Sequence, residues 1–89
     1  MLIEFTERGW EEFSYWIQND PDMVEKIDEI IKSISKTPFQ GIGKPEPLKY
    51  DLKGFLSRRI SGEHRLIYEI SGKKGADQKC SIIQCRFHY

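Results

Sequence analysis

The sequence predicts an α+β domain in which an N-terminal strand and a two-helix hairpin precede an antiparallel sheet, with both helices packed on one sheet face. Three observations support this fold class. A short apolar stretch opens the chain, two segments with apolar residues at helical spacing follow, and three strand-like segments come last. The length of 89 residues suits one domain, so we expect residues 1–89 to form a single unit.

The first strand and the first helix are predicted within residues 2–19. Leu2–Phe5 is a short, mostly apolar stretch typical of a strand. Thr6 can cap a helix over Glu7–Asn19, because its hydroxyl oxygen can accept a hydrogen bond from a backbone N–H of the first turn. The apolar residues of this helix recur at helical spacing and are expected in the core: Trp10, Phe13, Trp16 and Ile17.

The second helix has the clearest periodicity in the chain. Asp20 suits its N-cap position and Pro21 its first helical position, while Thr37 and Pro38 end it. Its apolar stripe is expected to complete the core beside the first helix: Met23, Val24, Ile27, Ile30, Ile31 and Ile34.

The C-terminal half is predicted to supply the sheet. Glycine and proline interrupt residues 39–54, which are therefore expected to form a structured loop or a poor edge strand. Two strands follow, Phe55–Ser61 and Arg65–Ile70, joined at Gly62-Glu63. The last strand is predicted over Cys80–Phe87.

The turn between the two central strands decides which side chains share a face. A two-residue turn would pair Ser61 with His64, whereas a three-residue loop would pair Ile60 with His64 and place Arg59 opposite Arg65. The second register separates apolar from polar residues more cleanly, and register follows the hydrophobic pattern. We therefore expect Arg59 and Arg65 side by side on the exposed face, with His64 on the apolar side.

The net charge of +0 conceals a strong asymmetry along the chain. Residues 1–31 hold nine acidic and two basic residues, whereas residues 32–89 hold twelve basic and five acidic ones. Such a distribution favours a basic surface that binds a polyanion, with an acidic surface facing elsewhere. Nucleic acid is the polyanion that this pattern suggests first.

Composition also limits where the protein acts. No apolar run reaches the roughly 20 residues of a membrane span, and the first residues lack the features of an export signal. We therefore expect a cytoplasmic protein. Cys80 and Cys85 fit neither a zinc site nor a redox pair; on a continuous strand they would lie on opposite faces, as reduced thiols with one in the core.

Five residues together suggest metal-independent RNA cleavage without a cofactor. Arg59 and Arg65, opposed across two strands, would repel each other unless an anion such as a phosphate lies between them. Glu46 is the single acid of a basic segment and can serve as general base toward a 2′-hydroxyl group. His88 can protonate the leaving 5′-oxygen, and Tyr89 can stack on a base.

Four motifs follow one another in the C-terminal half of the chain: Lys44–Lys49, Leu52–Ile60, Glu63–Tyr68 and Cys85–Tyr89. Taken in this order, they closely resemble the Txe/YoeB family, a group of type II toxin–antitoxin toxins within the wider RelE/ParE fold group. The resemblance runs nearly end to end and includes Trp10, Trp16 and the Lys36–Phe39 junction.

The resemblance implies a ribosome-dependent mRNA endonuclease that cuts the codon in the ribosomal A site and is silenced by a YefM/Phd-like antitoxin. It places the family's catalytic residues on Glu46, Arg59, Arg65, His88 and Tyr89. Substrate binding is assigned to Lys44, Lys49, Tyr50, Arg58 and Arg86. Arg86 would point the same way as His88 along the last strand, and Arg58 would lie near the rim of the apolar face. Tyr50 stands where some relatives carry a histidine, and the connection over residues 71–79 is longer than in shorter relatives.

Two other functions remain open at this point. One is a gyrase-inhibiting toxin of the ParE kind, which shares the fold without the Glu46–His88 pair. The other is a nucleic-acid-binding module that does not catalyse a reaction. The ribosome, mRNA and an antitoxin are the expected partners, and a homodimer is also possible; no membrane contact and no metal site are expected.

Overall fold

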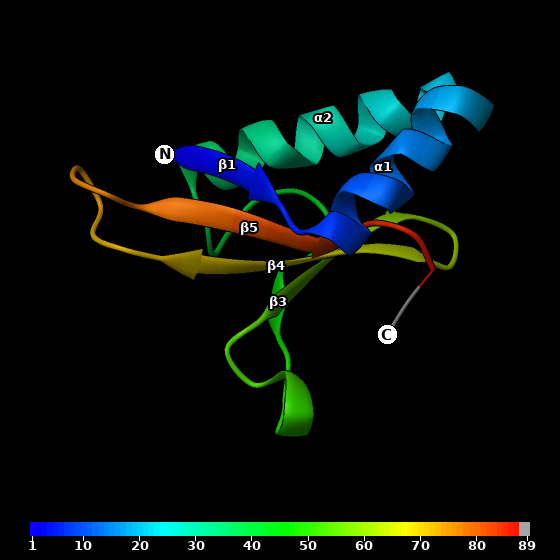
Figure 1. Ribbon diagram of the computed structural model, residues 1–89. Helices are drawn as coiled ribbons and strands as arrows, with labels where there is room; N and C mark the ends of the chain where they lie inside the picture. The colour runs from blue at the N-terminus through cyan, green and yellow to red at the C-terminus, as the bar shows by residue number, and fades with distance from the viewer. Residues whose placement is uncertain (88–89) are drawn as a thin grey trace.

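The computed structural model describes residues 1–87, and His88 and Tyr89 lie outside the described residues. Two helices lie over one face of a five-stranded sheet, as Figure 1 shows. This arrangement confirms the predicted α+β class. In chain order the elements are β1 (Leu2–Phe5), α1 (Glu7–Asn19), α2 (Pro21–Lys36), β2 (Glu46–Pro47), the 3₁₀ turn η1 (Tyr50–Leu52), β3 (Leu56–Ser61), β4 (His64–Ser71) and β5 (Lys79–Gln84).

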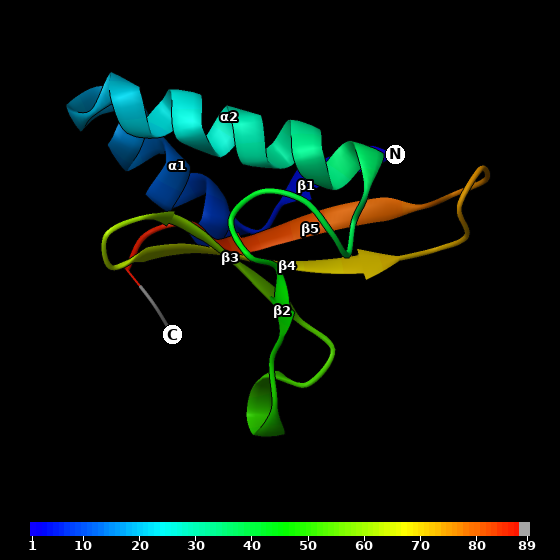
Figure 2. The ribbon, with the colours of Figure 1, turned by 180° about the vertical axis from the view of Figure 1, so that it is seen from behind.

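The strand order in the sheet is β1-β5-β4-β3-β2. β1 runs parallel to β5, and every other pair of neighbours is antiparallel. The first and last strands therefore pair although both helices separate them in the sequence. β2 forms the opposite edge, and together with η1 it projects away from the side that the helices cover (Figure 2).

Helix α1 begins as predicted at a threonine cap. Thr6 Oγ1 accepts a hydrogen bond from the Gly9 backbone N–H at 3.1 Å. Gly9 itself lies against β5, and a Cβ atom there would come within 2.3 Å of the Ile82 carbonyl oxygen. The absence of a side chain at Gly9 therefore lets the start of α1 pack directly on the sheet.

Helix α2 starts at Pro21 and ends at Lys36, with Asp20 at the N-cap position and Thr37 at the C-cap, as predicted. The Asp20 side chain makes no capping hydrogen bond. The buried stripe of α2 packs against Leu56, Leu66, Tyr68, Cys80 and Ile82 of the sheet to form the core; it consists of Met23, Ile27, Ile30 and Ile34.

The expectation that the whole apolar stripe of α1 is buried is wrong. Trp16 is buried, but Trp10 is 53 % exposed and Ile17 is 51 % exposed. Trp10 packs edge-on against Phe5, with their ring centroids 5.6 Å apart, at the margin of the sheet. The stripe is wider than the surface that α1 covers, so only its centre reaches the core.

The β3–β4 turn combines features of both registers. Ser61 pairs with His64 across a two-residue turn, so the expected pairing of Ile60 with His64 is wrong. An irregularity at Ile60 then shifts the register, and Arg59 lies opposite Arg65 as predicted. A β-bulge accommodates one extra residue in one strand, which allows the tight turn and the arginine pairing together.

The last strand is shorter than predicted, because β5 ends at Gln84 rather than Phe87. Both cysteines are completely buried, which corrects the expectation of one core cysteine. Cys85 has left the strand and therefore no longer alternates with Cys80; its Sγ lies 3.7 Å from the Gly9 carbonyl oxygen. Burial raises the pKa of each thiol to about 12, so both stay protonated at neutral pH.

Candidate functional site

The candidate site lies on the sheet face that the helices leave uncovered. Backbone pairing places Glu46 of β2 beside Ser57 of β3, and Arg59 of β3 beside Arg65 of β4. Because alternate residues of a strand share a face, Ser57 and Arg59 point the same way. Four polar side chains from three strands therefore meet on one surface.

An ion pair joins the predicted base to one of the predicted arginines. Arg65 Nη1 lies 3.4 Å from Glu46 Oε1, and the same nitrogen donates to Ser57 Oγ at 3.1 Å. The Arg65 side chain is 25 % exposed and that of Glu46 is 53 % exposed. An ion pair this open to water stabilises the fold by less than about 1 kcal/mol. Its effect is to hold the carboxylate and the guanidinium group together beside open solvent.

Ser57 is the residue of this surface that the sequence interpretation did not single out. It is completely buried, and its hydroxyl fixes the Arg65 guanidinium from below. The signal was present in the chain, because Ser57 lies two residues before Arg59 and so shares its face.

The predicted arginine pair is present. Arg59 is exposed and lies directly across from Arg65. Two like charges in this position favour an anion between or above them. Since Glu46 already compensates Arg65, the exposed Arg59 supplies the additional positive charge that a phosphate group would meet.

A backbone hydrogen bond links the segment before β2 to β3, the strand that carries Arg59. The Arg59 N–H donates to the Gly43 carbonyl oxygen at 2.7 Å. A Cβ atom on Gly43 would lie 2.9 Å from the Arg59 carbonyl oxygen, and its φ of +81° is in the left-handed region that favours glycine. Gly43 thus lets the backbone pass close to β3, which places the exposed Lys44 beside that strand.

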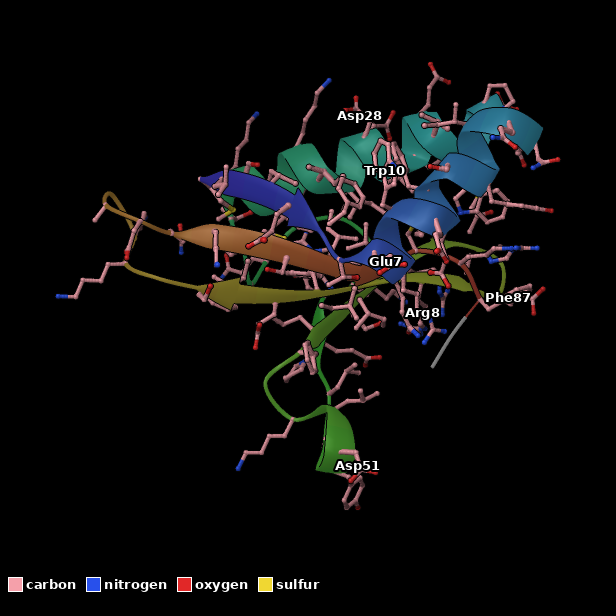
Figure 3. All side chains as sticks on the ribbon, viewed as in Figure 1. Glu7, Arg8, Trp10, Asp28, Asp51 and Phe87 are labelled. Atoms are coloured by element: carbon pink, nitrogen blue, oxygen red, sulfur yellow. The ribbon has the colours of Figure 1, made fainter. Side chains whose placement is uncertain are left out.

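Lys49 and Tyr50 lie on the projection formed by β2 and η1. Both are exposed, and Tyr50 is 92 % exposed with a left-handed φ of 58°. The projection carries a shallow hollow lined by Glu46, Lys49, Tyr50 and their neighbours Pro47, Leu48 and Leu52. Figure 3 shows the labelled side chain of Asp51 at the tip of this projection. An aromatic ring this accessible can stack on a nucleobase.

Arg58 is a correction to the expected site. Its side chain is on the helix side of the sheet, as predicted, but it is completely buried rather than near the rim. All its nitrogens have hydrogen-bond partners within the protein, so it is not available to a substrate. The acceptors are Ser33 Oγ, the Tyr68 hydroxyl and the carbonyl oxygens of Thr37, Pro38, Gln40 and Ile42.

Arg86 also differs from the expected arrangement, because β5 ends at Gln84 and Arg86 therefore does not lie on the last strand. Its guanidinium carbon lies 3.5 Å from the centre of the Tyr15 ring, which makes a close cation–π contact with α1. Its Nε is buried without a hydrogen-bond partner. A role of Arg86 in substrate binding stays a prediction.

The predicted acid His88 and the predicted stacking residue Tyr89 lie outside the described residues. The segment that leads to them is held by Glu12, Trp16 and His64, none of which the sequence interpretation assigned to the site. Their contacts come from elements far apart in the chain, so no local pattern indicates them. Within residues 1–87, no cluster of three or more His, Cys, Asp or Glu side chains suited to a metal ion is present, and no helix is long and apolar enough to cross a membrane.

Comparison with known proteins identifies the relatives of this chain. Residues 5–89 match the family model described as the YoeB-like toxin of bacterial type II toxin-antitoxin systems. Toxin YoeB of Synechocystis sp. is 51% identical over 89 residues, covering 100% of this chain and 98% of that protein. The structure of a YoeB/ParE toxin from Agrobacterium tumefaciens matches with a TM-score of 0.94 at 47% identity, covering 100% of both chains.

Relatives from Staphylococcus aureus are known both as a dimer and in a complex. YoeB from Staphylococcus aureus, solved as a dimer, matches with a TM-score of 0.88 at 43% identity, covering 100% of this chain and 98% of that one. A YoeB toxin from Staphylococcus aureus has also been solved in a heterotetrameric complex with YefM. Fold and sequence together place the chain among the toxins of bacterial type II toxin–antitoxin systems. Within that class, it belongs to the YoeB family.

Proposed function

We propose that this chain is an endoribonuclease that cleaves mRNA in the A site of the ribosome and thereby inhibits translation. The observation that carries the proposal is the Glu46–Arg65 ion pair at 3.4 Å, with Arg59 across from Arg65 on the same open face. A carboxylate can take the proton of an attacking hydroxyl group, and guanidinium groups beside it can stabilise the charge that grows on a phosphodiester.

The proposed reaction uses the RNA's own 2′-hydroxyl group as nucleophile. Glu46 accepts the 2′-hydroxyl proton as the 2′-oxygen forms a bond to the neighbouring phosphorus. The bond from phosphorus to the 5′-oxygen breaks, and His88 donates a proton to that leaving oxygen. The products are a 2′,3′-cyclic phosphate and a free 5′-hydroxyl group. Arg59 and Arg65 stabilise the negative charge that grows on the phosphate oxygens in the transition state.

The residues around this centre are proposed to hold the RNA. Lys44 and Lys49 are exposed beside Glu46 and supply positive charge for phosphate groups. Tyr50 supplies a stacking surface for one base, and Tyr89 another. Because the site is an open face and not a deep cleft, the substrate must be ordered by something else. The ribosome is proposed to do this by presenting a codon in extended form, which also implies action in the cytoplasm.

An antitoxin of the YefM/Phd kind is the proposed inhibitor. The Staphylococcus aureus relative forms a complex with YefM, which supports a partner of this kind for this chain. An acidic or amphipathic segment that folds on binding would cover the basic face. The YoeB dimer from Staphylococcus aureus supports a homodimer as a further assembly.

The test is primer extension on a defined mRNA, with and without ribosomes stalled at a known codon. The wild-type chain is compared with Glu46→Ala and His88→Gln. Glu69→Ala is the matched control, because Glu69 is an exposed carboxylate on β4, four residues after Arg65. We expect a cut in the A-site codon only with ribosomes, lost in both site variants and kept in the control.

Two results would contradict the proposal. Cleavage that persists in Glu46→Ala would show that Glu46 is not the general base. Growth arrest without any RNA cleavage would favour inhibition of gyrase, which a supercoiling assay with purified gyrase would then measure directly, or RNA binding without catalysis.

A further inference from the structure

Beyond the end of β5, hydrogen bonds from side chains hold the backbone where pairing with a neighbouring strand would otherwise do so. Trp16 Nε1 donates to the Cys85 carbonyl oxygen at 2.8 Å. Glu12 Oε1 accepts from the backbone N–H groups of Cys85 at 2.8 Å and Arg86 at 3.2 Å. Helix α1 therefore fixes the chain at the point where it leaves the sheet.

Phe87, the last described residue, is held at both ends of its backbone by two consecutive residues of β4. Its N–H donates to His64 Nδ1 at 2.7 Å, and its carbonyl oxygen accepts from the Arg65 N–H at 2.9 Å. Its φ of 60° is left-handed, an unusual conformation for a residue with a side chain. Phe87, which directly precedes His88 in the sequence, is thus bonded to the backbone of Arg65, a proposed catalytic residue.

The His64 ring is itself held in place. Trp16 packs edge-on against it, with their ring centroids 4.8 Å apart. The Phe87 ring lies tilted relative to the His64 ring, with their centroids 5.4 Å apart. A backbone N–H can donate only to a ring nitrogen that has a free lone pair. His64 must therefore be neutral, with its proton on Nε2, for the 2.7 Å hydrogen bond to exist.

We propose that His64 is a positioning residue for the end of the described chain: its neutral Nδ1 fixes the Phe87 peptide beside the Arg65 backbone, one residue before the proposed acid His88 in the sequence. The effect on cleavage rests on the function proposed above. The hydrogen-bond arrangement does not, and it is testable without RNA.

The first experiment observes the ring directly. Long-range ¹H–¹⁵N correlation spectra of the ¹⁵N-labelled full chain are recorded at mildly alkaline pH. We expect the Nε2–H tautomer for His64, with slow hydrogen exchange at the Phe87 amide. A proton on Nδ1 of His64, or a Phe87 amide that exchanges as fast as in a disordered peptide, would overturn the proposal.

The second experiment compares two variants of His64 whose hydrogen-bond acceptors differ in position by one covalent bond. In His64→Asn the side-chain oxygen occupies nearly the place of Nδ1, whereas in His64→Gln it lies one bond further out. Both variants lose the imidazole contact with Trp16, so both are expected to lower the melting temperature to a similar degree. With stalled ribosomes, we expect His64→Asn to keep kcat within about threefold, and His64→Gln to lose at least about tenfold in kcat with little change in KM.

The outcomes separate a positioning role from a purely structural one. Equal losses in the two variants, following the loss of stability, would overturn the proposal. If the wild-type chain cleaves no RNA at all, the proposed function fails, and the tautomer and the Phe87 exchange rate still decide whether His64 holds the chain end.

Discussion

Arg58 and Tyr68 form a buried polar pair on the helix side of the sheet, where Arg58 Nε donates to the Tyr68 hydroxyl at 3.0 Å. The hydroxyl in turn donates to the Pro38 carbonyl oxygen at 2.8 Å. Since the other guanidinium nitrogens bind carbonyl oxygens of residues 37–42, the pair fastens the segment after α2 to the sheet. This segment leads to Gly43 and then to Glu46, so the buried pair supports the site from beneath.

Arg58→Met is expected to destabilise the fold by about 3 kcal/mol, because the buried Tyr68 hydroxyl and several part-buried carbonyl oxygens lose their donor. Urea unfolding followed by circular dichroism measures this change. The matched control is Arg59→Met at the neighbouring exposed position, where a change below about 0.5 kcal/mol is expected. Equal effects of the two substitutions would show that the buried contacts do not stabilise the chain.

Ser57→Ala is expected to lower ribosome-dependent cleavage about fivefold, because Arg65 loses one of its two side-chain partners, a hydrogen bond worth about 1 kcal/mol. Single-turnover kinetics on stalled ribosomes measure the rate. Ser81→Ala serves as control, because Ser81 on β5 bonds Glu4 instead. A rate unchanged in Ser57→Ala would show that the Ser57 hydroxyl does not position Arg65.

Substitutions of Tyr50 are expected to affect stability and RNA binding differently. Its φ of 58° costs about 1–2 kcal/mol for a residue with a Cβ atom and nothing comparable for glycine. Tyr50→Gly is therefore expected to resist urea better than Tyr50→Ala by about 1 kcal/mol. Both substitutions remove the ring and are expected to weaken RNA binding by about 1–3 kcal/mol, measured as a rise in KM. Tyr50→Phe, which keeps a ring, should bind nearly normally, and equal binding by all three variants would exclude stacking.

The two buried thiols predict a loss of stability at alkaline pH. Burial raises the pKa of Cys80 and Cys85 from 9.0 to about 12. Between these values the unfolded chain loses thiol protons that the folded chain keeps, so the free energy of unfolding falls as pH rises. This contribution is fully present below pH 9 and lost as pH approaches 12. Burial also raises the pKa of Tyr68, which adds to the same slope.

Urea unfolding at a series of alkaline pH values measures this slope. The double variant Cys80→Ala/Cys85→Ala is expected to be less stable at neutral pH but to lose stability more gradually above pH 9. Tyr68 contributes to the slope that remains, because burial raises its pKa as well. A slope identical to that of the wild-type chain would contradict the thiol contribution.

Local patterns were sufficient for the helices and for part of the site. The bounds of α1, its Thr6 cap and the start of α2 at Pro21 agree with prediction, because spacing and capping depend on neighbours within one or two helical turns. The opposition of Arg59 and Arg65 was also predictable, since alternation of apolar and polar residues decides which face a strand buries.

The remaining features depend on partners that are distant in the chain. The sequence by itself determined the two helices, the approximate positions of the longer strands, the family and the open face with its arginine pair. The tertiary structure decided that Arg58 is buried under the segment after α2, that a bulge at Ile60 adjusts the hairpin, and that β5 ends at Gln84. The end of β5 at Gln84 has a clear cause. Side chains of α1 and β4 bind the backbone of Cys85–Phe87, and hydrogen bonds between residues more than twenty positions apart leave no periodic signal in a sequence.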